Sequence, residues 1–185
     1  MIGFHNISNA AAAFALTSHL GISTSLIKKS LKDFQGVERR FNKVFDFNGV
    51  TFFDDYAHHP TEIKEVLNGV KKSYSNKKVI SIFQPHRISR LNDLSNDFSK
   101  SFKNSDQVLL CPVYKAGEKI KLKFKYEKFA RDISKNSKAL VIMVNQKQDL
   151  VKFFKNNLKG NEIVIGMGAG SISGWLKELK NFLKQ

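Results

Sequence analysis

Small and hydrophobic residues recur at helical spacing near the start of the chain. The stretch NISNAAAAFALTSHLGI is rich in alanine and ends at Gly21, a residue typical of helix C-termini. The stretch STSLIKKSLKDF then begins with serine and threonine, which cap helices, and spaces its apolar residues three to four apart. We predict two antiparallel helices here. Their faces are strongly apolar for so short a unit, so we expect them to pack on something larger than each other.

The pattern changes to alternation after QGVERRF. NKVFDF and VTFFDD alternate apolar and polar positions, and the Asn-Gly pair between them supplies the positive φ angles of a tight turn. This predicts a β-hairpin. We therefore place a domain boundary near Gly36, with a helical segment over residues 1–36 and a second domain over residues 37–185.

The rest of the chain alternates short apolar strands with helical patterns. The strands are KKVISIF, QVLLCPV, KALVIMV and NEIVIGMG, and the helices are TEIKEVLNGVKKSY, SRLNDLSNDFSKSF, KYEKFARDIS, KQDLVKFFKNNL and SISGWLKELKNFLK. Strands this apolar are typical of a sheet covered on both faces. The predicted fold is α/β, a Rossmann-like, mainly parallel sheet with one antiparallel edge strand, preceded by a short helical segment. Functional groups should then cluster at the carboxyl ends of the strands.

Composition indicates a globular protein of a reducing compartment. Hydrophobic residues make up 42% of the 185 positions, enough for a core. Cys111 is the single cysteine, so an internal disulfide and a multi-cysteine zinc site are excluded. We see no signal sequence and no apolar run long enough to cross a bilayer. The expected protein is soluble and cytoplasmic, without a membrane partner.

Net charge of +15 would suit a nucleic-acid-binding module, which is one alternative. The distribution of the positive residues along the chain argues against nucleic acid as the partner. The lysines are scattered, whereas four of the five arginines form two pairs, Arg39 with Arg40 and Arg87 with Arg90. A guanidinium fork binds carboxylate or phosphate in bidentate fashion. The paired arginines therefore indicate placed anion ligands.

The stretch DDYAHHPTEI joins a predicted strand to a predicted helix. Pro60 suits a first helical turn and Glu62 favours the helix dipole. A metal site is disfavoured, because adjacent residues of an extended segment point to opposite faces and few of the aspartates and histidines can converge. A capped turn whose histidines only form hydrogen bonds and a turn that presents ligands to a bound molecule both stay open.

Two further stretches follow predicted strands. In FQPHRISR, Arg87 and Arg90 lie three residues apart, so on a helix both guanidinium groups would reach one face and clamp a small anion; ordinary surface cations are the alternative. IVIGMGAGSISGW is a glycine-rich turn without the spacing of a dinucleotide fingerprint, and it favours a close backbone turn. The phosphate loop G-x-x-x-x-G-K-[ST] occurs nowhere in the chain.

Six stretches in this order resemble the Mur ligases, in particular those that join L-alanine to UDP-N-acetylmuramate: GFHNISNAAAAFAL, GVERRF, DDYAHHPTEI, FQPHRISR, VYKAGE and MGAGSIS. The resemblance covers the closing helices of the ATP-binding central domain and the C-terminal Rossmann-like domain. It implies that the N-terminal and central ligase domains are the missing partners. Ile88 and Ser171 depart from the pattern, where a tyrosine and an acidic residue are expected.

The resemblance also implies a reaction and a set of site residues. ATP and Mg²⁺, both bound mainly by the central domain, convert the muramoyl carboxylate to an acyl phosphate, which the amino group of L-alanine attacks. This chain would close the site and be inactive alone. A ligase that recycles muramate by attaching a tripeptide is one alternative, and a regulatory α/β domain is another. The implied ATP-binding residues are Asn6, Asn9, Arg40 and Asp55, and the implied amino-acid-binding residues are Tyr56, His58, Arg87 and Arg90.

Overall fold

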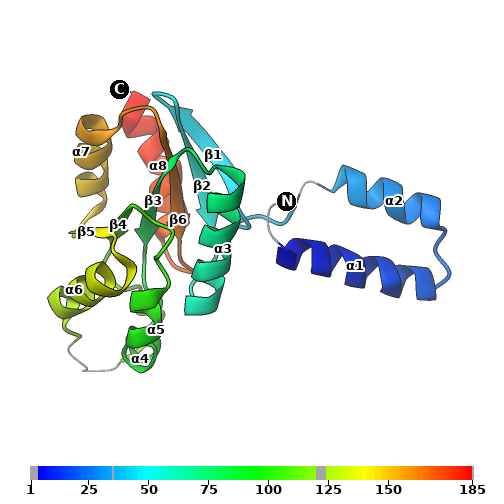
Figure 1. The fold of residues 1–185 in the computed structure, drawn as a ribbon, viewed down its shortest axis with the longest axis horizontal. Coiled ribbons are helices and arrows are strands. Elements are labelled where there is room, and N and C mark those ends of the chain that lie inside the picture. The colour runs from blue at the N-terminus through cyan, green and yellow to red at the C-terminus, as the bar shows by residue number, and fades with distance from the viewer. Residues whose placement is uncertain (1–3, 35, 120–123, 185) are drawn as a thin grey trace.

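A computed structural model describes residues 4–34, 36–119 and 124–184 and shows a sheet flanked by helices, with a helical hairpin beside it (Figure 1). The described helices are α1 (Phe4–His19), α2 (Thr24–Asp33), α3 (Pro60–Ser73), α4 (Ile88–Asp93), α5 (Ser95–Lys100), α6 (Tyr126–Ser137), α7 (Lys147–Asn157) and α8 (Ile172–Lys184).

The described strands form one sheet in the order β1-β2-β6-β3-β4-β5. Only β1 pairs in antiparallel fashion, with β2, and every other pairing is parallel. The predicted α/β fold, with an antiparallel edge strand from the opening hairpin, is confirmed. The strands are β1 (Asn42–Phe47), β2 (Val50–Asp55), β3 (Lys78–Phe83), β4 (Gln107–Leu110), β5 (Leu140–Met143) and β6 (Glu162–Met167).

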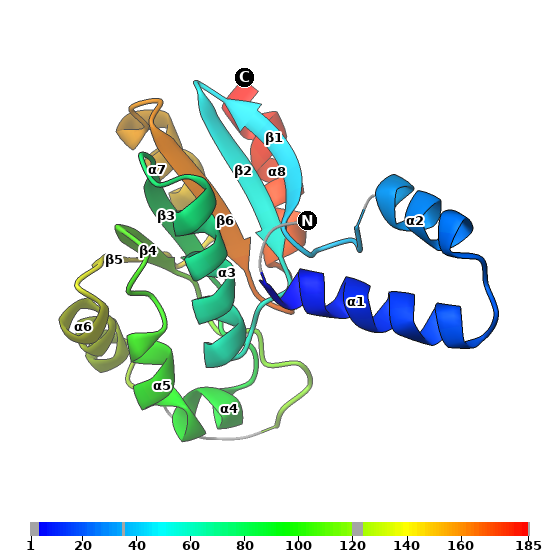
Figure 2. The same cartoon turned by 45° about the vertical axis from the view of Figure 1, so that its right-hand side comes forward.

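Alternation along the strands builds a core on each face of the sheet. Val79 and Phe83 of β3 pack in the cluster that contains the buried side chains of α3, α5 and α6. Ile80 and Ile82 pack in the other cluster, with α7 and α8. α3 and α8 accordingly lie on opposite sides of the sheet (Figure 2). The edge strand β5 is less covered than we expected from its apolar sequence, since Leu140 is 55% exposed.

One of the expected helices is divided in two. SRLNDLSNDFSKSF was expected to form one helix, but it forms α4 and α5, because Leu94 leaves helical geometry with φ −111° and ψ 17°. Contacts to residues 114–118 hold the start of α4, whereas Phe98 and Phe102 beyond the break lie in the core. The bend at Leu94 thus allows α4 to contact residues 114–118 while α5 packs into the core.

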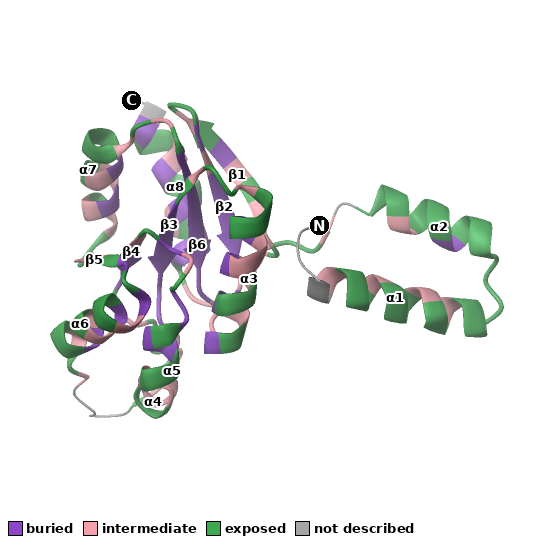
Figure 3. Ribbon diagram, viewed as in Figure 1, coloured by how far each residue is buried: buried purple, intermediate pink, exposed green. Residues whose placement is uncertain are grey.

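The predicted helical hairpin forms, and it leaves its apolar residues open. α1 and α2 extend away from the sheet in Figure 1, and Figure 3 shows them largely exposed. Ile27 is the one buried side chain among the residues of these helices whose burial is described. Within the described part of the chain, no helix is long and apolar enough to cross a membrane. The exposed large hydrophobic residues of the hairpin are Ile7, Leu16, Leu20, Ile22, Leu26 and Phe34.

Candidate functional site

Three parallel strands end side by side and carry the candidate residues at their carboxyl ends. Asp55 ends β2 and Phe83 ends β3, and both are in register with Met167 at the end of β6. A bridge between His86 and Tyr114 extends the pairing beyond β3. The segments that follow these strands therefore meet at one edge of the sheet, which is where parallel α/β sheets bind ligands.

The turn before α3 is capped by its own side chains. His59 is the N-cap residue, and its Nδ1 accepts a hydrogen bond from the Thr61 N–H at 3.4 Å. Glu62 Oε2 accepts from the backbone N–H groups of His58 at 2.9 Å and His59 at 3.1 Å. Burial alone would raise the pKa of Glu62, but these hydrogen bonds and the nearby His58 hold it below its usual value. His59 and Glu62 thus have the structural role of a capped turn.

Asp55 ties the segment before β1 to the end of β2. Its Oδ1 accepts from the Ala57 N–H at 2.7 Å, and its Oδ2 accepts from the Phe41 N–H at 2.9 Å. The side chain is buried, and burial raises the pKa of Asp55 although both hydrogen bonds oppose the change. Each carboxylate oxygen keeps acceptor capacity beyond these single bonds.

A pocket of about 370 Å³ lies between α1, α3 and the segment before β1. Asn6 and Asn9 of α1, Arg40 and Asp55 all line it, together with apolar side chains such as Val37. The structure therefore brings together the four residues that the resemblance implies for ATP. Amides, a cation, a carboxylate and an apolar wall are groups that can hold a base, a phosphate and a ribose.

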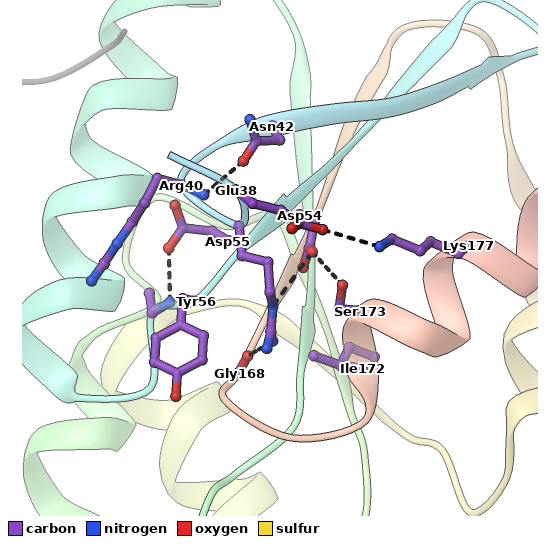
Figure 4. Close-up of polar contacts among 12 residues, drawn as sticks. Glu38, Arg40, Asn42, Asp54, Asp55, Tyr56, Gly168, Ile172, Ser173 and Lys177 are labelled. Carbon is purple, nitrogen blue, oxygen red and sulfur yellow. Dashed lines mark hydrogen bonds and ion pairs between the residues drawn. The ribbon is translucent and has the colours of Figure 1, made fainter. Parts of the chain in front are cut away.

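The adjacent residues Arg39 and Arg40 have different surroundings, and Figure 4 shows Arg40 together with Asp54, Asp55 and Tyr56. Arg39 Nη2 donates to the Gly168 carbonyl at 2.5 Å, and its Nε lies 3.6 Å from Asp54 Oδ2. Arg40 lines the pocket instead. Both guanidinium groups lie over the ring of Tyr56, at 4.7 and 5.8 Å from its centroid. Arg39 is therefore the arginine of this doublet that pairs with Asp54.

A row of rings crosses the same sheet edge beside the pocket. The ring centroids of Tyr56 and His58 lie 5.2 Å apart, those of His58 and His86 lie 5.6 Å apart, and those of His86 and Tyr114 lie 5.7 Å apart. His58 Nδ1 donates to the Tyr56 carbonyl at 2.9 Å, which fixes the orientation of the ring. Burial lowers the pKa of His86, and the neighbouring His58, Arg90 and Arg87 lower it further.

Arg87 and Arg90 follow this row, but not with the helical spacing that we expected. α4 begins at Ile88, and Arg87 precedes it with φ 70°, so the argument from the i, i+3 face of a helix is wrong for this pair. The Arg87 N–H donates to the Tyr114 carbonyl at 2.9 Å, and this pairing fixes its backbone outside the helix. Arg87 is exposed, and Arg90 Nη1 is buried with no hydrogen-bond partner among the described residues. Both arginines still belong to this sheet edge.

Glu118 supplies the cap that α4 lacks. The N-cap residue Arg87 makes no capping hydrogen bond with its side chain. The Glu118 carboxylate instead accepts from the Ile88 N–H at 2.7 Å and from the Ser89 hydroxyl. These hydrogen bonds, that of Ser89 foremost, hold the pKa of Glu118 below its usual value. The arginine pair is therefore positioned by a loop about thirty residues further along the chain.

The glycine-rich turn before α8 is tightly packed, which confirms the close backbone turn that the sequence predicts. A Cβ on Gly170 would lie 2.5 Å from Tyr114 Cγ and 2.6 Å from Gln84 Oε1. Gln84 Oε1 also accepts from the Ile172 N–H at 3.0 Å, and its Nε2 donates to the Ser171 hydroxyl at 3.0 Å. Ser171 thus belongs to the cap of α8.

No group of three or more histidine, cysteine, aspartate or glutamate side chains that could hold a metal ion occurs within residues 4–34, 36–119 and 124–184. The side chains of the first three residues of the DDYAHHPTEI stretch contact different parts of the fold. Asp54 contacts Ser173 of α8, Asp55 contacts Phe41, and Tyr56 lies under the arginines.

The fold is that of a ligase domain. Residues 39–170 match the family model of the Mur ligase, glutamate ligase domain, so the chain belongs to this family. Over 183 residues, 99% of the chain, it is 58% identical to the UDP-N-acetylmuramate–L-alanine ligase of Pelagibacter ubique. The chain spans only 39% of the length of that curated relative.

Solved structures agree with this assignment. The UDP-N-acetylmuramate–alanine ligase MurC of Thermotoga maritima matches all of the chain with a TM-score of 0.81 and 28% identity. The murein peptide ligase of Psychrobacter arcticus matches 99% of it with a TM-score of 0.73 and 25% identity. The chain covers 39% and 38% of these two proteins.

Sequence reasoning missed several contacts at the site. It gave no specific partner to Arg39 or Asp54, and it quoted Glu118 only as part of the VYKAGE motif. Partners of these side chains come from distant parts of the chain, such as Ser173 for Asp54. No local pattern encodes such a contact, although the unusual density of charge in ERRF and DD was a signal that some of these groups pair.

Proposed function

We propose that this chain is the C-terminal domain of an ATP-dependent ligase that joins L-alanine to UDP-N-acetylmuramate in peptidoglycan precursor synthesis. The observation that carries the proposal is the gathering of two groups of motif residues at one sheet edge, one around the pocket and one along the row of rings. The similarity to a ligase of that name over 99% of the chain supports it.

The pocket group suits the nucleotide. Asn6 and Asn9 offer amide donors and acceptors to the adenine, Arg40 offers a cation to the phosphates, and Asp55 offers a carboxylate to the ribose hydroxyls. When bound, ATP with Mg²⁺ supplies the phosphoryl group that activates the muramoyl carboxylate. The described residues form no cage for Mg²⁺, so we assign the ion mainly to phosphates and to other parts of the ligase.

The second group suits the amino acid. Arg87 and Arg90 both lie close enough to His86 to lower its pKa, and Arg90 Nη1 is buried with no hydrogen-bond partner among the described residues, so this arginine keeps a donor for a carboxylate. The rings of His58 and Tyr56 connect His86 to Arg40, which lines the pocket. An alanine held by its carboxylate here would direct its amino group toward a carboxyl group activated beside Arg40.

The remaining ligase would cover the helical hairpin. Its exposed apolar residues need a partner surface, and the central domain of the relatives provides one by our assignment. We therefore expect the chain to be inactive alone, since its sequence holds no phosphate loop. We place the ligase in the cytoplasm, where ATP is available.

A titration of the ¹⁵N-labelled chain with UDP-N-acetylmuramoyl-L-alanine tests the proposal. Saturable NMR shifts should concentrate at the side-chain Nε–Hε groups of Arg87 and Arg90 and at Tyr56 and His58, and Arg87→Ala should abolish them. Arg131→Ala is the matched control, because it removes the same charge from an exposed position on α6. The corresponding muramoyl tripeptide, bound at least as tightly, would favour the recycling ligase.

A DNA duplex provides the opposing outcome. Broad shifts with DNA that weaken steeply with salt, and none with the muramoyl product, would mean that net charge determines the function and the proposal is wrong.

A further inference from the structure

The backbone between α2 and β1 has an unusual conformation on both sides of Arg40. Arg39 has φ 59° and Phe41 has φ 53°, both in the left-handed region that residues with a side chain seldom adopt. Conformations of this kind persist only where surrounding contacts over-determine them. Contacts of Arg39 and Phe41 must therefore hold this segment.

Backbone hydrogen bonds account for part of that hold. The Tyr56 N–H donates to the Arg39 carbonyl at 2.7 Å, the Arg40 N–H donates to Asn42 Oδ1 at 2.8 Å, and the Phe41 N–H donates to Asp55 at 2.9 Å. The bonds to Tyr56 and Asp55 attach the segment to the end of β2, and the bond to Asn42 attaches it to the first residue of β1. They do not attach it to β6 or α8.

The Arg39 side chain makes the second attachment. It reaches Gly168 after β6 and Asp54 at the end of β2, and Asp54 Oδ2 in turn accepts from the Ser173 hydroxyl of α8 at 2.6 Å. The side chains of Arg39 and Asp54 are 22% and 5% exposed. Arg39 Nε and Asp54 Oδ1 are buried with no hydrogen-bond partner among the described residues, so each charge is compensated by the other.

The direction of Arg40 follows from this attachment. While the Arg39 side chain is fixed toward β6 and α8, the next residue, Arg40, lines the pocket together with Asn6, Asn9 and Asp55. Figure 4 shows the Arg40 side chain pointing away from Asp54 and Gly168. We propose that Arg39 and Asp54 are a positioning pair, which fixes the backbone at residues 39–41 and thereby aims Arg40 at the nucleotide. The role of Arg40 rests on the proposed function, but the pair itself does not.

Arg39→Lys tests the pair, because lysine keeps the charge and loses the planar fork that reaches both Gly168 and Asp54. Asp54→Asn is the second variant, close in size and without the charge. Lys177→Ala is the matched control, since it breaks the neighbouring but exposed ion pair between Lys177 and Glu38. If Arg39→Lys fails to fold, Asp54→Asn carries the same expectation.

The first readout needs no ligand. In the ¹⁵N-labelled chain, both variants should broaden or shift the Arg40 Nε–Hε signal and the amide signals of Arg40 and Phe41, while the amides of β3 and β4 stay in place. Lys177→Ala should match the wild type. Arg40 and Phe41 signals that are the same in wild type and in both variants would overturn the proposal.

The second readout is a titration with Mg-ATP. Arg39→Lys should weaken Mg-ATP binding by about tenfold, the scale of one misplaced charge-assisted contact, and at saturation the shift of Arg40 should be smaller than in the wild type while those of Asn6 and Asn9 are unchanged. An equal loss of the saturating shift at all three residues would indicate a general structural role and would contradict the positioning role. If ATP shifts no signal even in the wild type, the assignment of this pocket to the nucleotide fails for the chain on its own, and the ligand-free spectra alone decide on the pair.

Discussion

Neighbouring residues of like chemistry perform different tasks at this site. Asp54 turns toward α8, whereas Asp55 turns toward the segment before β1 and the pocket. Arg39 is held inside the fold and Arg40 lines the pocket. In the extended backbone at the end of β2, successive side chains point to opposite faces, which separates Asp54 from Asp55. Arg39 and Arg40 lie in a turn instead, where the left-handed backbone of Arg39 and its contacts to Asp54 and Gly168 separate the two side chains.

Glu118 shows how a single side chain can position others. It caps α4 from a distant loop, next to the backbone of Arg87. Its folded pKa is depressed, so its contribution to stability is present above the unfolded pKa and is lost as the pH falls through the folded value. The stabilisation by this carboxylate is therefore present at neutral pH and is lost in acid.

We predict that Glu118→Gln lowers the thermal midpoint at pH 7, because glutamine cannot supply a charged acceptor to the Ile88 N–H and the Ser89 hydroxyl. The difference from the wild type should shrink as the pH falls below 4.5, the usual value for glutamate. Calorimetry from pH 7 to below pH 4.5 measures the difference in thermal midpoint between the variant and the wild type. Glu127→Gln, on the exposed first turn of α6, is the control. A difference that stays constant with pH would contradict the charged cap.

The glycine in the turn before α8 and the glycine inside α8 differ in the space around them. A Cβ added to Gly170 would lie closer to atoms of Tyr114 and Gln84 than van der Waals contact allows. A Cβ added to Gly174 would meet nothing within 4 Å. Rotation about the side-chain bonds of Tyr114 cannot relieve the contact at its own Cβ, which would lie 2.6 Å away. Only movement of the backbone could admit alanine at Gly170.

We therefore predict that Gly170→Ala destabilises the chain by about 1–3 kcal/mol, as overpacking does. Gly174→Ala should stabilise it by about 0.5–1 kcal/mol, because alanine is the better residue inside a helix. Urea denaturation of the two variants gives both values. Equal effects of the two substitutions would mean that the turn does not pack on Tyr114 as described.

The order and type of the elements could be predicted from the sequence, because hydrophobic periodicity and the Asn-Gly turn are local signals. The break at Leu94 could not, since it depends on attachments at both ends of the segment. The same limit applies to the site. The motif doublets were recognisable, but the left-handed backbone of Arg87 and the cap from Glu118 are set by tertiary contacts.

At the scale of the whole molecule, the chain consists of a well-covered sheet and a poorly covered hairpin. Sheet residues such as Phe52 and Phe83 are fully buried, whereas Leu16 and Leu20 of the hairpin are more than 60% exposed. A helix draws most of its stability from packing its apolar face. The hairpin should thus be far less stable than the sheet when the chain is on its own.

Hydrogen exchange measures this difference directly. We predict that amides of α1 exchange on the order of a hundredfold faster than those of β6, because local opening of the hairpin exposes little further apolar surface. α3 is the internal control, since it is of similar length but buries Ile63, Leu67 and Val70 against the sheet. Its amides should exchange slowly, like those of β6. Protection of α1 equal to that of α3 would show that the hairpin is stable without cover, and the argument for a covering ligase domain would lose its physical basis.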